Sequence, residues 1–428
     1  MAEPARSAAM LELIRDLYPI CRSITGPGVR ETLHRMAQEV PLDIRGVPTG
    51  TDVFDWQVPP EWHLRDAYIE TPDGRRIASA ADHNLHVVNF SAPVDCSLSL
   101  DELLPHLHSI PEHPDWIPYR TSYYSRDWGF CLRHRDRERL AGGTYRVVVD
   151  SSIQDGELNY GELLVPGQSE EEVLVYSHLC HPSIANDNLS GLAITASWAR
   201  SLLDGETPWF SYRFVWGPGT IGSITWLATN EKRLPLIRHG LVAVLLGRPG
   251  PLHYKRSRRG DAEIDRIASY VLAGRNEDSV IRDFDPYGYD ERQFCSPGLD
   301  LPVGRLSRTP HGEYPEYHTS ADNIEILSEQ SLADALEVCE RIGRCLDRNR
   351  VYENLFPYGE PQLGKRGLYG STGGRNPKED EYAMLWLLNQ ADGKNDLLSV
   401  AERSGLVMDD LYRVALALEE KKVIRKVA

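Results

Sequence analysis

The chain has 428 residues, and its 63 acidic against 47 basic side chains give a formal net charge of −16 at pH 7. This length predicts two to four domains and a core large enough to fold without disulfides or a structural metal. The acidic balance argues against a general binder of nucleic acids or anionic membranes, because both need a basic protein surface.

The cysteines and the N-terminal segment indicate the compartment. Seven cysteines are scattered along the chain without a CxxC pair, which argues against a disulfide framework. The N-terminal segment lacks the apolar stretch of a signal peptide, and the longest aliphatic run, Leu241–Leu246, is far too short to cross a bilayer. We therefore predict a cytoplasmic protein with no membrane partner.

Two regions of different composition open the chain. Residues 8–40 carry apolar residues at helical spacing, interrupted by Gly-Pro-Gly at 26–28, and predict two helices. Residues 49–135 are rich in Trp, Tyr, His and Pro, with short alternating segments that predict an inserted β-rich domain. Its segment TSYYSRDWGFC at 121–131 fits either a cap over a cleft or an oligomer interface. We expect a homo-oligomer.

Strands alternate with helices in the middle of the chain. Three apolar segments are predicted strands: 172–178, 211–217 and 241–247. Helical segments follow the first two of them, at 190–205 and after residue 222. This alternation predicts an α/β core with a mostly parallel sheet, to which we assign residues 1–48 and 136–355.

The C-terminal part begins with a long predicted helix at 327–348, followed by a Gly/Pro-rich linker at 356–378. Residues 379–428 then predict three helices and a short strand, in the order of a winged helix-turn-helix. Residues 375–428 hold nine basic and ten acidic side chains, whereas a DNA-binding domain needs a basic face. We therefore predict a packing or dimerisation domain and no nucleic-acid partner.

Candidate metal ligands follow the predicted strands, whose carboxyl ends meet at one edge of a parallel sheet. His178 ends the first strand, Asp187 lies in the loop before the next helix, and His318 belongs to the distant segment HGEYPEYHTSADN. Such a set suits a hydrolytic zinc, because three protein ligands leave one position for a water whose pKa the metal lowers. Taken singly, each histidine could be an ordinary hydrogen-bonded residue and Asp187 a helix N-cap. Together they predict one zinc ion.

Longer motifs resemble a known family. HLCHPSIANDNLSG resembles the metal loop of the M28 zinc aminopeptidases, TIGSITWLA their Gly-Ser helix start, and YHTSADN their late His-Thr-x-x-Asp segment. More closely, SHLCHPSIANDNLSG, YKRSRRGDAEIDR, GYDERQFCSPG and PHGEYPEYHTSADN resemble bacterial aminopeptidase-like proteins of the DUF4910 family with an inserted DUF2172 domain. The resemblance covers nearly the whole chain. It implies a zinc-aminopeptidase-like α/β core and a C-terminal winged-helix domain. It also implies a gene near those for polysaccharide or natural-product biosynthesis, and so a role in such a pathway.

Three positions depart from the two-metal pattern of the M28 peptidases. Pro218-Gly219 stand where that pattern has an acidic pair, Gly247-Arg248 stand in place of a Gly-Asp step, and Cys180 replaces an aspartate. The three predicted ligands alone carry over, so the resemblance implies one ion and leaves a second site doubtful.

Three arrangements remain open at this stage. A single zinc on the three predicted ligands is chemically sufficient. A neighbouring group, such as His181, Cys180 or a late carboxylate, could complete the site. In a metal-free site, the guanidinium of Arg248 could instead stand as a fixed cation or bind a substrate carboxylate.

The general base must come from outside the Pro218-Gly219 step, which has no side chain able to take a proton. Glu313 and Glu316 precede His318, and Glu291 lies in YGYDERQF. Each is equally explained as a solvated or salt-bridged carboxylate. One of them could also hold the amino group of a substrate.

Supporting roles complete the predicted site. We assign Arg248 and Tyr317 to substrate binding, and Asp322 and His181 to the shell around the ligands, with Asp322 orienting His318. The basic run KRSRRG at 255–260 fits an anionic substrate or intramolecular salt bridges.

Two functions follow from these observations. The first is a zinc-dependent, aminopeptidase-like amide hydrolase acting on an aminoacyl or acylamino small molecule or a short peptide. The second is a catalytically inactive relative that binds a biosynthetic intermediate or a partner protein. The three retained ligands favour the first, and the missing carboxylates favour the second. A DNA-binding regulator is a weaker third reading, because the C-terminal domain is acidic.

Overall fold

The computed structural model describes residues 3–275, 278–368 and 377–427. Its contacts group the chain into two compact units, one of Met1–Asp265 with Arg275–Cys339 and one of Arg266–Gly274 with Glu340–Ala428. The boundary falls inside two helices, α7 (Glu263–Ala273) and α9 (Glu329–Arg348), so each helix contributes residues to both units.

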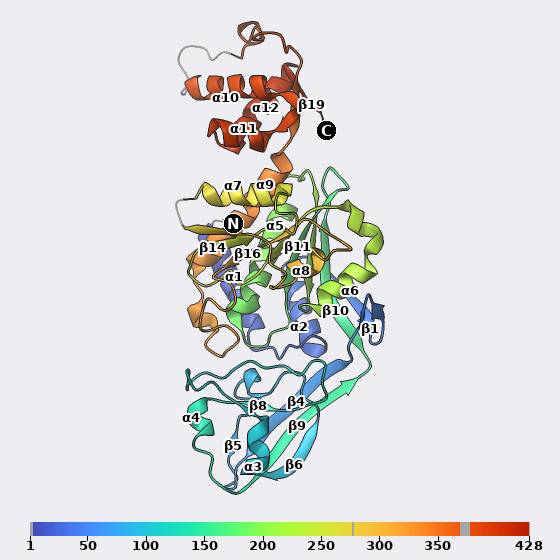
Figure 1. Cartoon of the computed structure of the whole chain (residues 1–428), viewed down its shortest axis with the longest axis vertical. Coiled ribbons are helices and arrows are strands. Elements are labelled where there is room, and N and C mark those ends of the chain that lie inside the picture. Colours follow the sequence, from blue (N-terminus) through green and yellow to red (C-terminus); the bar gives the residue numbers. More distant parts are fainter. Residues whose placement is uncertain (1–2, 276–277, 369–376, 428) are drawn as a thin grey trace. The chain divides into compact units, whose positions relative to one another are not determined.

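An eight-stranded sheet organises the first unit (Figure 1). Its strands, in spatial order, are β1 (Asp43–Pro48), β10 (Glu157–Val165), β12 (Ser211–Gly217), β11 (Glu172–His178), β13 (Ile237–Ala243), β16 (Val303–Arg308), β14 (Leu252–Lys255) and β15 (Ser279–Arg282). The central strands β12, β11, β13 and β16 run parallel, whereas β10 and β14 join them antiparallel. The predicted α/β class with a mainly parallel sheet is confirmed.

Helices cover both faces of this sheet because its central strands are apolar on both sides. Every residue of β11 and β12 is buried, as expected for parallel strands between two layers. Successive residues of β12 point to opposite faces: Phe214 contacts Trp198, whereas Val215 packs in a cluster with Trp226. The helices are α1 (Glu3–Leu17), α2 (Pro27–Met36), α5 (Gly191–Asp204), α6 (Ile221–Thr229) and α8 (Glu291–Phe294).

The inserted domain has its own sheet and core. Four antiparallel strands lie in the order β5 (Arg76–Ile77), β4 (Glu61–Glu70), β9 (Thr144–Gln154) and β6 (Val94–Ser99). Shorter elements complete it: β2 (Asp52–Val53), β3 (Trp56–Gln57), α3 (Leu100–Leu103), β7 (Leu107–His108), β8 (Phe130–Cys131) and α4 (His134–Arg137). Strand β9 lies beyond residue 135, where we expected the core to resume. Its cross-strand partners are β4 and β6, so it belongs to the inserted domain.

The second unit contains a three-stranded sheet with three helices. The strands lie in the order β18 (Asp392–Asp396), β17 (Val351–Asn354) and β19 (Ile424–Lys426), and the helices are α10 (Pro377–Gln390), α11 (Leu397–Ser404) and α12 (Met408–Glu420). Strand β17 lies in the range that we assigned to the core, yet both of its neighbours are C-terminal strands. Of the predicted linker 356–378, residues 369–376 lie outside the described residues.

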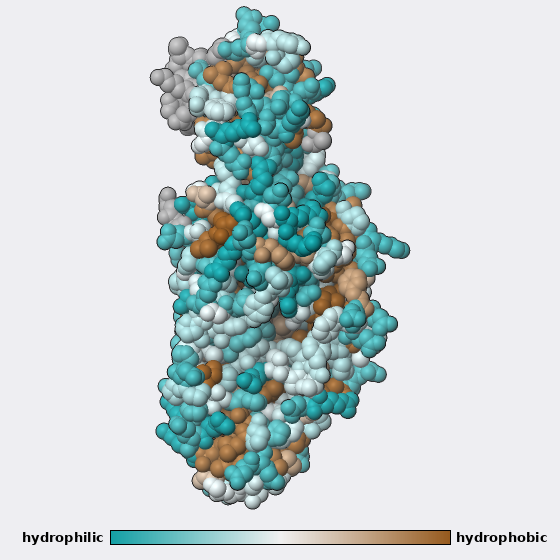
Figure 2. Space-filling view, in the orientation of Figure 1, coloured by the Kyte–Doolittle hydropathy of each residue, from teal (hydrophilic) through white to brown (hydrophobic). Residues whose placement is uncertain are grey.

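The face of the protein shown in Figure 2 is mainly hydrophilic. Figure 2 shows hydrophobic residues in small separate patches on the face in view. No helix in the described part of the chain is both long and apolar enough to span a bilayer. All seven cysteines are free thiols.

Candidate metal centre

The candidate ligands gather at the carboxyl end of β11. This strand ends at His178, and the chain then forms the helical turn Ala185–Ser190 before entering α5. Asp187 and Asn188 have non-helical backbone angles inside this turn. Polar side chains at the ends of parallel strands form the usual binding edge of such a sheet.

A single carboxylate lies at the middle of the cluster. The Asp187 side chain is fully buried; its Oδ1 lies 2.8 Å from Nε2 of His178, and its Oδ2 lies 2.9 Å from Nε2 of His318. Burial opposes ionisation of Asp187, but the charges of His181 and the hydrogen bond from His178 hold its pKa well below the usual range. The structure thus brings together the three ligands that the sequence predicts.

His181 joins the same carboxylate. Its Nδ1 lies 3.1 Å from the backbone carbonyl oxygen of Asp187 and 3.3 Å from Oδ2. Ligand atoms of His178, His181 and Asp187 all lie within 4.8 Å of one another. His181, which we predicted in a supporting role, therefore has the position of a further ligand candidate.

This donor set suits zinc. Zinc binds imidazole nitrogens and carboxylate oxygens, and a catalytic site needs three protein ligands. Asp187, His178 and His181 supply three mutually close donors, and Nε2 of His318 adds a fourth beside Oδ2 of Asp187. A cation would also compensate the buried negative charge of Asp187, which the structure otherwise balances by imidazoles alone.

Three side chains of the ANDNLS turn fasten it to the end of β13. Asn186 Oδ1 accepts hydrogen bonds from the backbone N–H groups of Gly247 and Arg248, at 2.9 and 3.1 Å. Asn188 Oδ1 accepts from Leu245 N, and Ser190 Oγ accepts from Leu246 N, both at 3.0 Å. These bonds give the Asn and Ser residues around Asp187 a structural purpose, which is to fix the loop that carries the ligand. Strand β13 ends at Ala243, before the end of the predicted strand 241–247.

Asp322 supports the same turn from the other side. Its Oδ1 accepts from Asn186 N at 2.6 Å, and its Oδ2 accepts from Asp187 N at 3.2 Å and from the Tyr314 hydroxyl at 3.0 Å. Burial raises the pKa of Asp322 to about 7. Its described hydrogen bonds therefore position Asp187, whereas we had expected it to orient His318.

The inserted domain holds His318 in place. Tyr119 N donates to the His318 carbonyl oxygen at 2.8 Å, and Ser320 N donates to the Ile117 carbonyl oxygen at 2.8 Å. His318 has a positive φ of 55°, which is uncommon for a residue other than glycine and needs support from its surroundings. The Tyr317 ring stacks on His318 with centroids 3.9 Å apart. Tyr317, predicted to bind substrate, thus also contacts a ligand candidate.

Asp290 is a residue that the sequence reasoning missed. A Cβ on Gly219, in the step that lacks the expected acidic pair, would lie 3.2 Å from Asp290 Oδ2 and 3.3 Å from His178 Cβ. The buried Asp290 carboxyl accepts a hydrogen bond from Ser223 Oγ at 2.7 Å, and its Oδ2 lies 4.0 Å from Nδ1 of His178. Burial raises its pKa to about 6. A carboxyl group from the start of α8 therefore lies beside the position that lacks one.

Glu291, the neighbouring residue that we selected as a base, has other partners. Its Oε1 pairs with Lys255 Nζ at 2.8 Å and with Arg305 Nη1 at 3.3 Å, and the three side chains are buried. Its Oε2 accepts from Tyr289 N at 3.0 Å. The described contacts thus place Glu291 in a buried ion cluster. The motif GYDERQF contains both Asp290 and Glu291, and the sequence of the motif does not tell which of the two side chains faces His178.

The other two predicted bases, in the segment 311–323, form ion pairs with arginines. Glu313 pairs with Arg282 at 2.7 Å, and Glu316 lies 3.7 Å from Nε of Arg248. Glu316 Oε2 is buried without a hydrogen bond among the described residues. Within the basic run 255–260, Lys255, Arg256, Arg258 and Arg259 each have an intramolecular carboxylate partner. This arrangement favours the salt-bridge reading of that run.

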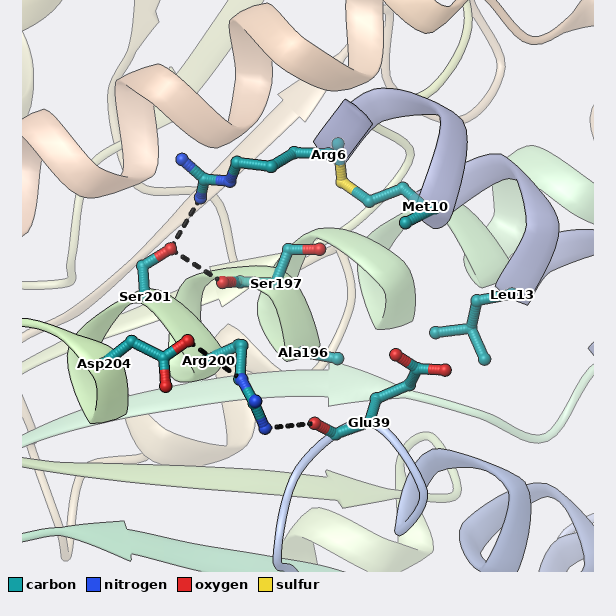
Figure 3. Close-up of a pocket in the computed structure, with 10 residues that line it drawn as sticks. Arg6, Met10, Leu13, Glu39, Ala196, Ser197, Arg200, Ser201 and Asp204 are labelled. Atoms are coloured by element: carbon teal, nitrogen blue, oxygen red, sulfur yellow. Dashed lines mark hydrogen bonds and ion pairs between the residues drawn. The ribbon is translucent and has the colours of Figure 1, made fainter. Parts of the chain in front are cut away.

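A separate pocket of about 190 Å³ lies between α1 and α5 (Figure 3). Arg6 donates to Ser201, and Arg200 pairs with Asp204 and with the Glu39 carbonyl oxygen. Arg200 and Asp204 are therefore neutralised by each other, and the residues that line this pocket are not those of the Asp187 cluster.

Comparison with known protein families identifies the two parts of the chain. Residues 11–349 match the family described as "Domain of unknown function (DUF4910)". The chain belongs to the DUF4910 family. Residues 350–426 match a winged helix-turn-helix family, so the predicted C-terminal fold is confirmed. That match begins just before β17, in agreement with the strand pairing.

Relatives of this DUF4910 protein carry peptidase names. A Clostridium acetobutylicum protein described as a polysaccharide biosynthesis protein with an aminopeptidase-like domain is 48% identical over 412 residues, 94% of each chain. A crystal structure of a protein from the same organism, described as a peptidase by its name only, is 44% identical, with a TM-score of 0.94 over 99% of this chain and 97% of that chain. A zinc aminopeptidase from Bacillus subtilis has a TM-score of 0.57 at 14% identity, over 78% of this chain and 94% of that chain. The last likeness establishes the shared fold, and the predicted aminopeptidase-like core is confirmed.

Proposed function

We propose that this protein is a zinc-dependent amide hydrolase with one metal ion held by Asp187, His178 and His318. The substrate would be an aminoacyl or acylamino small molecule or a short peptide. The observation that carries the proposal is the fully buried Asp187 carboxylate, which three imidazoles surround at the carboxyl edge of the parallel sheet. His181 is the fourth donor, and one of the four can stay outside the coordination that a catalytic zinc needs.

When bound, zinc supplies a Lewis acid for an amide carbonyl and lowers the pKa of a water molecule. The protein has to supply a group that takes a proton and one that orients the substrate. Asp290 is the leading candidate for the first role, because its carboxyl lies beside Gly219 and His178. Glu316 is the second candidate, and Arg248 beside it offers a cation for a substrate carboxylate.

The biological setting is also part of the proposal. The name of the Clostridium relative supports a role in polysaccharide biosynthesis. We propose a cytoplasmic enzyme that forms homo-oligomers, with the acidic winged-helix domain as a packing or dimerisation element. A DNA partner is disfavoured because the helix in the recognition position, α12, has two acidic residues in its first turn and ends in two glutamates.

Metal analysis tests the proposal. We expect about one zinc per chain in protein purified without chelator, loss of that zinc in Asp187→Asn, and retention in the control Asp204→Asn, whose side chain is exposed. Hydrolysis of an aminoacyl anilide should follow the metal content. Protein that folds normally but binds no zinc, even after zinc is added, would refute the proposal.

The missing carboxylates at Gly219 and Arg248 favour a second function, that of a binder without turnover. A zinc-loaded protein that binds acylamino compounds but does not hydrolyse them would support this alternative. In that case Asp290→Asn should leave ligand affinity unchanged, because no proton has to move.

A further inference from the structure

Two large aromatic side chains lie exposed and adjacent on the inserted domain. Trp56, on the β2–β3 hairpin, is 45% exposed, and Tyr124, in the loop between β7 and β8, is 62% exposed. Their ring centroids are 5.3 Å apart at an interplanar angle of 55°. Single exposed hydrophobic residues are ordinary on a protein surface, but two adjacent exposed aromatic rings indicate a binding surface.

These rings continue inward to the candidate ligands. The Tyr124 and Tyr123 centroids are 6.4 Å apart, and the Tyr123 hydroxyl lies 2.6 Å from the Tyr119 hydroxyl. The Tyr119 ring then meets the rings of His181 and His318 edge-on, at 5.0 and 5.2 Å. We name Trp56, Tyr124, Tyr123 and Tyr119 the aromatic row.

The other side of the hairpin fixes its position. Strand β2 packs against α6, the helix that begins directly after Gly219-Thr220. Val53 is fully buried, so the hairpin presents Trp56 from a fixed base. The row is therefore attached to the site at both ends, through α6 and through Tyr119.

The chemistry of the row favours a sugar ring over an apolar side chain. An apolar side chain gains most from an enclosed pocket, because its affinity scales with the area removed from water. Trp56 and Tyr124 are instead open, and their neighbours Asp55, Gln57, Ser125 and Arg126 are exposed and polar. An open ring face with a polar rim suits a pyranose, whose C–H face stacks on the ring while its hydroxyls reach polar groups and water.

We propose that the aromatic row binds a pyranose ring of the substrate, with Trp56 and Tyr124 as the stacking surface. This inference rests on the proposed function for the position of the amide, which would lie at Asp187. It also resolves the open reading of segment 121–131 in favour of a cap over the site. The substrate class becomes an acylamino or aminoacyl group attached to a saccharide.

Ligand-observed NMR on the full-length protein as purified tests this inference, with cellobiose and N,N′-diacetylchitobiose as probes. We expect saturation transfer from the protein to the sugar C–H protons at millimolar probe concentrations. Trp56→Ala and Tyr124→Ala should each weaken binding about three- to tenfold, the size of one stacking contact. Tyr382→Ala, which removes a 52% exposed aromatic ring from α10 in the second unit, is the matched control.

Three results would overturn the inference. One is the absence of saturation transfer from both disaccharides, and another is binding that Trp56→Ala and Tyr124→Ala leave unchanged. The third is preferential binding of N-acetyl-leucine amide that depends on Trp56, which would make the row an apolar side-chain site. Repeating the titration on chelator-treated protein separates this inference from the proposed function, because stacking does not need the metal. Sugar binding by protein that takes up no added zinc and shows no turnover would leave the row intact and refute the hydrolase.

Discussion

Two buried carboxylates in the first unit, Asp187 and Glu291, are equally inaccessible to water but have different counter-charges. Asp187 is surrounded by three imidazoles, whereas Glu291 is paired with the ammonium of Lys255 and the guanidinium of Arg305. An imidazole can give up its proton and bind a metal, but a guanidinium stays charged and offers no lone pair. The identity of the counter-charge therefore separates a candidate metal centre from a structural ion cluster.

The largest expected effect concerns stability. Glu291→Gln leaves two buried cations without their carboxylate and should lower the free energy of unfolding by about 3–5 kcal/mol. Asp187→Asn leaves no permanent charge unpaired, because the imidazoles can deprotonate, and should cost less than about 2 kcal/mol in chelator-treated protein. Urea unfolding at pH 7 measures both. Equal losses for the two variants would contradict the distinction.

A second prediction ranks the imidazoles. His178→Ala and His318→Ala should abolish zinc binding, whereas His181→Ala should weaken it about 10- to 100-fold, as expected for a group that supports the ligands. Competition with a chromophoric chelator gives the affinities, and His63→Ala, at an exposed position on β4, is the control. If His181→Ala instead removes the metal and His318→Ala retains it, the ion is held by His178, His181 and Asp187.

A third prediction concerns a pH dependence from Asp290. Burial raises the pKa of Asp290 from 3.8 to about 6, so the folded protein binds this proton more tightly than the unfolded chain. The contribution of Asp290 to stability is therefore highest below about pH 4 and falls as the pH rises to about 6. Asp290→Asn, which can keep the bond from Ser223, should remove this decline of on the order of 2–3 kcal/mol. Unfolding of chelator-treated protein at pH 4.5 and pH 8 checks it, and parallel pH profiles of the two proteins would argue against a buried, protonated Asp290.

Local sequence patterns predicted those helices and strands whose apolar residues recur over a long segment. The apolar segment 172–178 and the helix that begins near residue 190 were readable from consecutive residues, and β11 and α5 match them. We assigned strands β9 and β17 to the core, because the sequence of a strand carries no local signal for the strand it pairs with. Their hydrogen bonds go to β4 and β6 and to β18 and β19, residues that are distant along the sequence.

The sequence alone identified three candidate ligands of the metal centre. His178, Asp187 and His318 were recognisable because strand ends and loop motifs place ligand-type residues at one edge of a parallel sheet. Tertiary structure decided which carboxylate of the Asp290-Glu291 pair faces His178, that His181 reaches Asp187, and that the inserted domain holds His318. These are questions of direction between adjacent side chains and of contact between distant segments. Packing in three dimensions settles both, and residue order does not encode either one locally.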